Sequence, residues 1–127
     1  MPNNISEWLD HELSGYPSLD SLPPYRIITE AQVMALDPYR GWIPFQIVNT
    51  TGVNQEVYDS LTTIHINNPV AMLVDHAKSE SVLHSDLPAF MVDFIHKTTP
   101  YKYRLAWCIY PAQIINILSS VRFKILN

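Results

Sequence analysis

The feature that most constrains the fold is the strict alternation of side chains along residues 101–110. One side of this stretch carries Tyr101, Tyr103, Leu105, Trp107 and Ile109, and the other side carries Lys102, Arg104, Ala106, Cys108 and Tyr110. A period of two residues is typical of a β-strand that turns one face toward a core. Residues 101–110 therefore predict a strand.

A helix is predicted directly after this strand. Pro111 suits the first helical position, where the missing N–H of proline is not needed. Apolar side chains then recur at Ile114, Ile117, Leu118 and Val121, which is helical spacing. Residues 122–126 are expected to form a short strand or the start of a linker.

Earlier segments add a strand and a helix to this pair. Residues 61–66 alternate around β-branched side chains, which favours a strand. Residues 87–95 carry the apolar stripe of a helix, and Ser85 is expected to cap its start. Between them, residues 75–81 are polar enough for a surface excursion. The resulting order of strand, helix, strand and helix favours helices packed on one face of a small sheet.

In the first half of the chain, residues 30–36 and 42–48 predict a helix and a strand. Thr29 and Gln32 have the spacing of a capping box at a helix start. Residues 42–48 alternate as in a strand, and residues 49–52 close it as a turn. Pro44 has no backbone N–H, so this strand is expected at the edge of the sheet.

The N-terminal part predicts a helix followed by a proline-rich arm. Residues 5–13 have one apolar stripe, with Asn4 as the cap, and residues 15–24 hold glycine and prolines that break regular structure. The predicted class is α+β, with a small mixed sheet of three to four strands and helices on one face. We expect one globular domain overall, with helix and arm in residues 1–24 and the α+β body in residues 25–127.

The distribution of charge is uneven. The chain has 127 residues, of which only 16% are charged. Residues 1–93 hold all 12 acidic residues and three basic ones, whereas residues 94–127 hold five basic residues and no acidic one. Such asymmetry indicates either a basic face that docks an acidic partner or two halves that neutralise each other in the fold.

Cysteine content and hydropathy predict a cytoplasmic protein. Cys108 is the single cysteine, so it has no partner for an internal disulfide. No basic-then-apolar signal segment precedes the first acidic residues. The longest apolar runs are also far shorter than the roughly 20 residues that cross a bilayer.

Catalytic, metal and cofactor signatures are not found in the sequence. Three glycines are too few for a glycine-rich phosphate loop. Asp75, His76, His84 and Asp86 form the densest group of metal-ligand types, but their spacing is not that of a closed zinc site. Cys108 lies among apolar residues, as a small buried side chain does. We therefore expect no catalytic residue, metal or cofactor, and a protein that is not an enzyme.

The order of several short motifs resembles a known family. The motifs are residues 42–45 (Trp-Ile-Pro-Phe), residues 64–69 ending in Asn-Pro, residues 87–97, residues 101–110 and residues 111–121. Together they resemble the N-terminal domain of type II secretion and type IV pilus assembly ATPases. The resemblance implies a docking or regulatory domain at the inner membrane. Its partner would be the cytoplasmic segment of an inner-membrane platform protein.

Two hypotheses for function remain open. The first is a non-catalytic protein-binding domain similar to that ATPase domain, with contacts through Lys102 and Arg104 or through the strand edge at Pro44 and Gln46. The alternative is a standalone toxin-neutralising, immunity-like protein or an inhibitor of a host factor. Nucleic acid is not expected as a partner, because the sequence pI is about 5.6.

Overall fold

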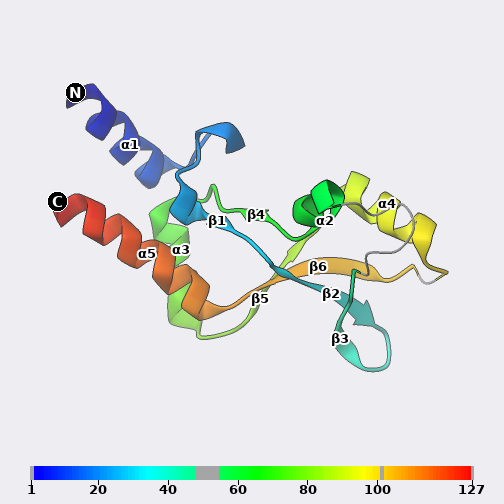
Figure 1. Cartoon of the computed structure of the whole chain (residues 1–127). Coiled ribbons are helices and arrows are strands. Elements are labelled where there is room, and N and C mark those ends of the chain that lie inside the picture. The colour runs from blue at the N-terminus through cyan, green and yellow to red at the C-terminus, as the bar shows by residue number, and fades with distance from the viewer. Residues whose placement is uncertain (1, 48–54, 101, 127) are drawn as a thin grey trace. The chain divides into compact units, whose positions relative to one another are not determined.

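The computed structural model describes residues 2–47, 55–100 and 102–126 (Figure 1). Packing divides the chain into two compact units. The helical unit consists of Met1–Ile28, His65–Leu83 and Tyr110–Asn127, and the sheet unit consists of Thr29–Ile64 and His84–Ile109. The chain alternates between the two units, so neither of them is one continuous stretch.

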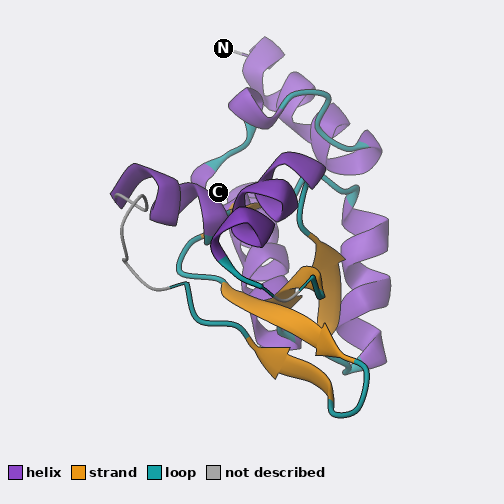
Figure 2. Ribbon diagram, turned by 90° about the vertical axis from the view of Figure 1, so that its right-hand side faces the viewer, coloured by secondary structure: helices purple, strands orange, loops and turns teal. Residues whose placement is uncertain are grey.

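A four-stranded sheet with the order β3-β2-β6-β5 organises the sheet unit (Figure 2). Its strands are β2 (Gln32–Asp37), β3 (Gly41–Pro44), β5 (Leu83–Asp86) and β6 (Arg104–Ile109). β2 runs antiparallel to both β3 and β6. The predicted edge position of the Pro44 strand is confirmed, although this strand is shorter than expected. The predicted turn at residues 49–52 lies outside the described residues.

The predicted strand in residues 101–110 is confirmed as β6, with its start at Arg104. Its residues from Leu105 to Ile109 are all buried, so the core covers both faces and not one. The indole Nε1 of Trp107 donates to the carbonyl oxygen of Leu61 at 2.8 Å. This bond joins the strand to the end of α2 (Gln55–Leu61), a short helix of the sheet unit.

The helix predicted over residues 30–36 is wrong, because this segment is β2. Val33 and Ala35 alternate with less buried neighbours and lie opposite β6 in the register. Glu30 has φ of 53°, a left-handed conformation that a helix does not accept. Gln32 also does not reach back to a cap, since its side chain donates to the carbonyl oxygen of Val33. Pairing with neighbouring strands therefore overrides the local capping pattern.

Three helices form most of the helical unit: α1 (Pro2–Ser14), α3 (Val70–Ser79) and α5 (Pro111–Leu126). α3 packs against both α1 and α5. The helix predicted from Pro111 is confirmed, but it continues through residues 122–126, so the expected strand or linker there is wrong. The polar segment from residue 75 to residue 79 is also helical and not a surface excursion.

The arm between α1 and the first strand contains two short 3₁₀ turns, η1 (Leu19–Ser21) and η2 (Pro24–Arg26). Tyr16 and Leu22 of this arm are buried, whereas Leu19 is 50% exposed. A two-stranded sheet of β1 (Ile27–Ile28) and β4 (Ile64–His65) completes the strands. The strand expected over residues 61–66 is thus only two residues long.

The remaining helix, α4 (Ala89–Thr98), is confirmed, but its predicted cap is not. Ser85 belongs to β5, and Pro88 occupies the N-cap position. Asn4 likewise lies within α1 and does not precede it. The α+β class itself is confirmed. None of the described helices is both long and apolar enough to cross a bilayer.

Replacement of Gly41 tests the hairpin formed by β2 and β3, which is the reason that residues 32–37 form a strand and not the predicted helix. Gly41 has φ of +77°, and nothing lies within 4 Å of a Cβ added there, so the cost of a side chain is that of the backbone alone. Gly41→Ala should lower the free energy of unfolding by about 1–2 kcal/mol, and Gly41→Asn should lower it less. Urea denaturation of wild type and the two variants measures the free energy of unfolding. Equal stability of Gly41→Ala and wild type would contradict the positive φ of Gly41.

Candidate functional site

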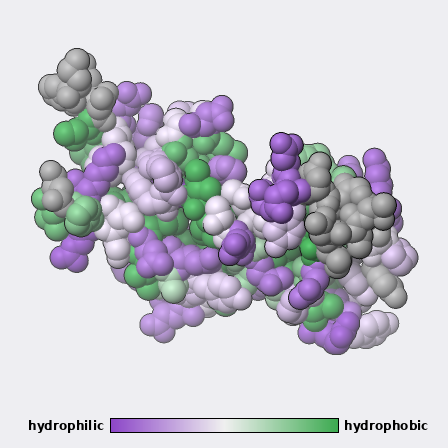
Figure 3. Space-filling view, in the orientation of Figure 1, coloured by the Kyte–Doolittle hydropathy of each residue, from purple (hydrophilic) through white to green (hydrophobic). Residues whose placement is uncertain are grey.

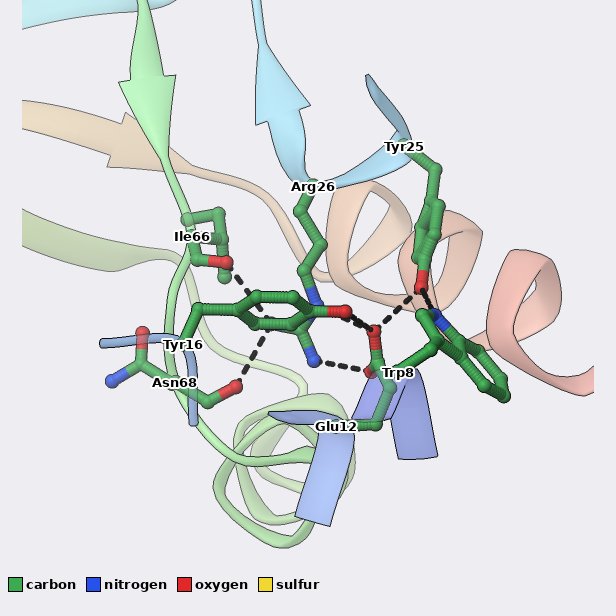
Figure 4. Close-up of polar contacts among 7 residues, drawn as sticks. All are labelled: Trp8, Glu12, Tyr16, Tyr25, Arg26, Ile66 and Asn68. Carbon is green, nitrogen blue, oxygen red and sulfur yellow. Dashed lines mark hydrogen bonds and ion pairs between the residues drawn. The ribbon is translucent and has the colours of Figure 1, made fainter. Parts of the chain in front are cut away.

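A buried ion pair between Glu12 of α1 and Arg26 of η2 lies at the centre of the helical unit (Figure 4). Arg26 is 0% exposed and Glu12 is 1% exposed. The guanidinium donates from Nε to Oε2 at 3.0 Å and from Nη2 to Oε1 at 2.5 Å. Its Nη1 donates to the carbonyl oxygens of Ile66 and Asn68 at 3.0 and 2.8 Å. The pair thus joins α1, the arm and the segment before α3.

Aromatic side chains complete this polar network. The hydroxyl groups of Tyr16 and Tyr25 donate to Glu12 Oε2 at 2.6 and 2.5 Å, and Trp8 Nε1 donates to the Tyr25 oxygen at 2.8 Å. The guanidinium carbon of Arg26 lies 5.0 Å from the centroid of the Tyr16 ring. Figure 4 shows the aromatic rings arranged around the ion pair. The network therefore fixes the position of Trp8 on α1.

The network favours fixed protonation states. Burial raises the pKa of Glu12, but hydrogen bonds from Arg26, Tyr16 and Tyr25 and the charge of Arg26 together lower that pKa below its usual value. Burial and the hydrogen bond to Glu12 raise the pKa of both tyrosines. Among the described residues, no buried side-chain nitrogen or oxygen lacks a hydrogen-bond partner. We interpret this cluster as a structural support.

Trp8 forms part of a groove between α1 and α5, which we call the α1–α5 groove. Its lining residues are Ile5, Trp8, Leu9, Phe123, Lys124 and Ile125, and its volume is about 810 Å³. Lys124 Nζ lies 4.5 Å from the centroid of the Trp8 ring, which is a cation–π distance. Hydrophobic side chains are visible at the ends of both helices in Figure 3. The helical unit thus has a large apolar surface.

The sheet unit has a second groove, between α2 and α4, which we call the α2–α4 groove. Its volume is about 380 Å³, and its lining residues are Glu56, Val57, Ser60, Leu61, Phe90, Met91 and Phe94. Phe90 is 70% exposed, although it belongs to the apolar stripe of its helix. Among the described residues of this lining, Glu56 is the only charged one. The groove offers an apolar floor with one acidic group.

The predicted contact residues Lys102 and Arg104 already make contacts within the sheet unit. Arg104 donates to both carboxylate oxygens of Asp86, at 2.8 and 3.0 Å, and its guanidinium lies 5.5 Å from the Trp42 ring centroid. The hydrogen bond from Arg104 lowers the pKa of Asp86. Lys102 Nζ donates to the carbonyl oxygen of His96 at 2.6 Å. Asp86 therefore neutralises part of the basic face predicted from the sequence.

Pro44 and Gln46 lie at and just beyond the end of the edge strand β3, and both are exposed. Pro44 of β3 pairs with Met34 of β2. Two residues further along β2, Leu36 pairs with Trp42 of β3 on one side and with Arg104 of β6 on the other. Pro44 and Arg104 therefore lie on the two strands that flank β2, with an offset of two residues in the register. Partner binding by Lys102, Arg104, Pro44 and Gln46 stays a prediction.

The groups considered for chemistry are dispersed in the structure. His84 stacks on Trp42 with ring centroids 4.4 Å apart, and His76 belongs to α3. Within the part of the chain that the structure describes, no three His, Cys, Asp or Glu side chains come together as a metal site. Cys108 is 3% exposed in β6. The sequence analysis missed both grooves, although the apolar residues in the tail from Phe123 to Leu126 were a signal.

A protein-family model named AbiTii matches residues 3–127. The chain belongs to the AbiTii family, an abortive-infection family. This match overturns the resemblance to secretion and pilus ATPases. No curated protein and no solved structure gave a significant match. The alternative hypothesis, a toxin-neutralising protein or an inhibitor of a host factor, agrees with this family better than the ATPase hypothesis does.

Removal of one member of the buried ion pair should be costly. Arg26→Met leaves the Glu12 carboxylate buried without its cation, and we expect a loss of about 3–5 kcal/mol in the free energy of unfolding. The double variant Glu12→Leu/Arg26→Met should recover part of this loss, because no unpaired charge remains. Denaturant titration of both variants measures the difference. A double variant less stable than Arg26→Met would contradict the account.

The lowered pKa of Glu12 also predicts a pH dependence. The contribution of the ionised carboxylate is fully present above its unfolded pKa, near 4.3–4.5, and is lost as the pH falls through the lower folded-state pKa. The free energy of unfolding should therefore decrease below about pH 4.5 and decrease less steeply in Glu12→Gln. Glu7→Gln, at an exposed carboxylate of the same helix, serves as the control. Identical slopes in wild type and Glu12→Gln would overturn the assignment.

Proposed function

We propose that this AbiTii-family chain is a non-catalytic binding protein that acts in abortive infection by binding another protein in the cytoplasm. The partner would be a toxin, which the chain neutralises, or a host enzyme, which it inhibits. Membership of the family supports the defence role. The α2–α4 groove supports the binding role, because a groove with apolar side chains exposed to solvent is typical of a protein-interaction site.

The exposure of Phe90 is the observation that carries this proposal. A phenylalanine on a helix of a small sheet unit would ordinarily pack into the core, yet 70% of its surface is exposed. Met91 and Phe94 continue the same apolar wall, and Leu61 closes the groove on the side of α2. Aromatic residues at the centre of an apolar groove commonly contribute most of the binding energy in protein complexes.

The shape and charge of the groove indicate the kind of segment that binds. Two neighbouring helices form a groove that accepts the apolar face of a third helix. Glu56 lies in the wall of the groove and favours a lysine or arginine of the partner beside that apolar face. The two opposite charges would pair once the bound helix excludes water from the groove. We therefore expect an amphipathic, basic helix from the partner protein.

An infection assay tests this function. Bacterial cells that carry the gene in its native genetic context, or with Phe90→Glu, would be challenged with a panel of phages, and plaque formation and survival of infected cells would be measured. We expect Phe90→Glu to lose most of the protection, because a carboxylate in the groove opposes an apolar partner helix. Tyr39→Glu, at a side chain 95% exposed in the β2–β3 turn, is the matched control and should protect as wild type.

Two results would contradict the proposal. Deletion of the gene without any effect on infection would contradict the defence role. Protection by Phe90→Glu equal to that of wild type, with both proteins folded and equally abundant, would exclude the α2–α4 groove as the binding site.

A further inference from the structure

The helical unit carries an apolar surface that the proposed function does not use. Ile5, Leu9 and Leu13 form one stripe on α1 and are 65%, 39% and 64% exposed. On α5, Ile115 and Leu126 lie along one stripe and are 50% and 73% exposed. Ile5 and Leu9 also line the α1–α5 groove, so the stripe of α1 continues into it. Extended apolar surface exposed to solvent is typical of a binding site.

The charges on the two helices are opposite in sign. The exposed charged residues of α1 are Glu7 and Asp10, and those of α5 are Arg122 and Lys124. Asp10 is three residues before Leu13 of the apolar stripe, and Arg122 is four residues before Leu126. Neither Asp10 nor Arg122 makes an ion pair or hydrogen bond with another described residue. Asp10 on α1 and Arg122 on α5 thus lie close to the exposed apolar residues of their helices, and their charges are complementary.

We propose that two copies of this chain associate through this surface, with α1 of one copy packed against α5 of the other. A two-fold axis uses the same patch twice, so both helices of both copies are covered at once. Asp10 of each copy would then face Arg122 of the other. A partner of a single charge sign would suit one helix and oppose the other, whereas a second copy suits both.

The α1–α5 groove fits the same arrangement. Within one chain, Lys124 covers Trp8, but a volume of about 810 Å³ stays open beside it. Phe123, 70% exposed at the groove, is an aromatic side chain that can contact the α1 stripe of the second copy. The buried ion pair between Glu12 and Arg26 joins α1 to the arm, so the exposed stripe is presented on a helix that is held in place.

The proposal is tested with charge reversals that exchange partners. The whole chain would be measured by sedimentation velocity across a range of concentrations, as wild type, Asp10→Arg and Arg122→Asp. We expect wild type to dimerise and each variant alone to associate at least tenfold more weakly. In Asp10→Arg an arginine of one copy would face Arg122 of the other, and in Arg122→Asp an aspartate would face Asp10, so each variant repels its own copies at this contact.

A mixture of the two variants gives the decisive measurement. In the mixed pair, the arginine introduced on α1 of one variant meets the aspartate introduced on α5 of the other, and the two unaltered helices also meet as opposite charges. Equimolar mixing should therefore restore a dimer that contains one copy of each, detected by mass spectrometry with one variant isotope-labelled. Circular dichroism shows that each variant is folded. An intramolecular effect of the charges would not be rescued by mixing.

The following outcomes overturn the proposal. A wild-type protein that stays monomeric at all concentrations excludes this dimer. A dimer that both reversals leave unchanged places the interface elsewhere. Variants that stay separate on mixing exclude the pairing of α1 with α5. Phe90→Glu should still dimerise, so failure of this proposal is distinct from failure of the proposed function.

Discussion

Burying a guanidinium requires a hydrogen-bond acceptor for each of its nitrogen atoms, and Arg26 meets this requirement with groups from separate parts of the chain. Glu12 supplies both carboxylate oxygens, and the backbone before α3 supplies two carbonyl oxygens. A charge removed from water is tolerated only with such complete pairing. The orientation of α1, the path of the arm and the position of Trp8 all follow from it, and so does the apolar surface that α1 presents.

The sequence predicted elements whose pattern is decided locally. The alternation before Pro111 identified β6, and the apolar stripe after Pro111 identified α5. In both segments the local pattern and the packing in the fold favour the same secondary structure. β2 was mistaken for a helix, since Thr29 and Gln32 mimic a capping box and only pairing with β3 and β6 shows otherwise. Short apolar motifs also resembled the wrong family, because strands and helices of many folds share them.

The candidate surfaces were harder to predict than the fold. The stripe of Ile5, Leu9 and Leu13 was recognisable as a pattern, but a pattern does not say whether its apolar side is covered. Lys102 and Arg104 were chosen because they are basic, whereas the fold neutralises Arg104 with Asp86. Arg26, in a proline-rich arm, gave no sign that it is buried, since its acceptors are distant in sequence.

The alternation of the chain between its two units has a consequence for biosynthesis. The helical unit needs residues 1–28, 65–83 and 110–127, so it cannot close before its last stretch has left the ribosome. The stripe of α1, made first, stays without α5 during the whole of translation, which adds residues at about 5–20 per second. Nascent chains on neighbouring ribosomes would thus expose α1 before α5 has been synthesised. Early folding of this protein is therefore open to chaperones.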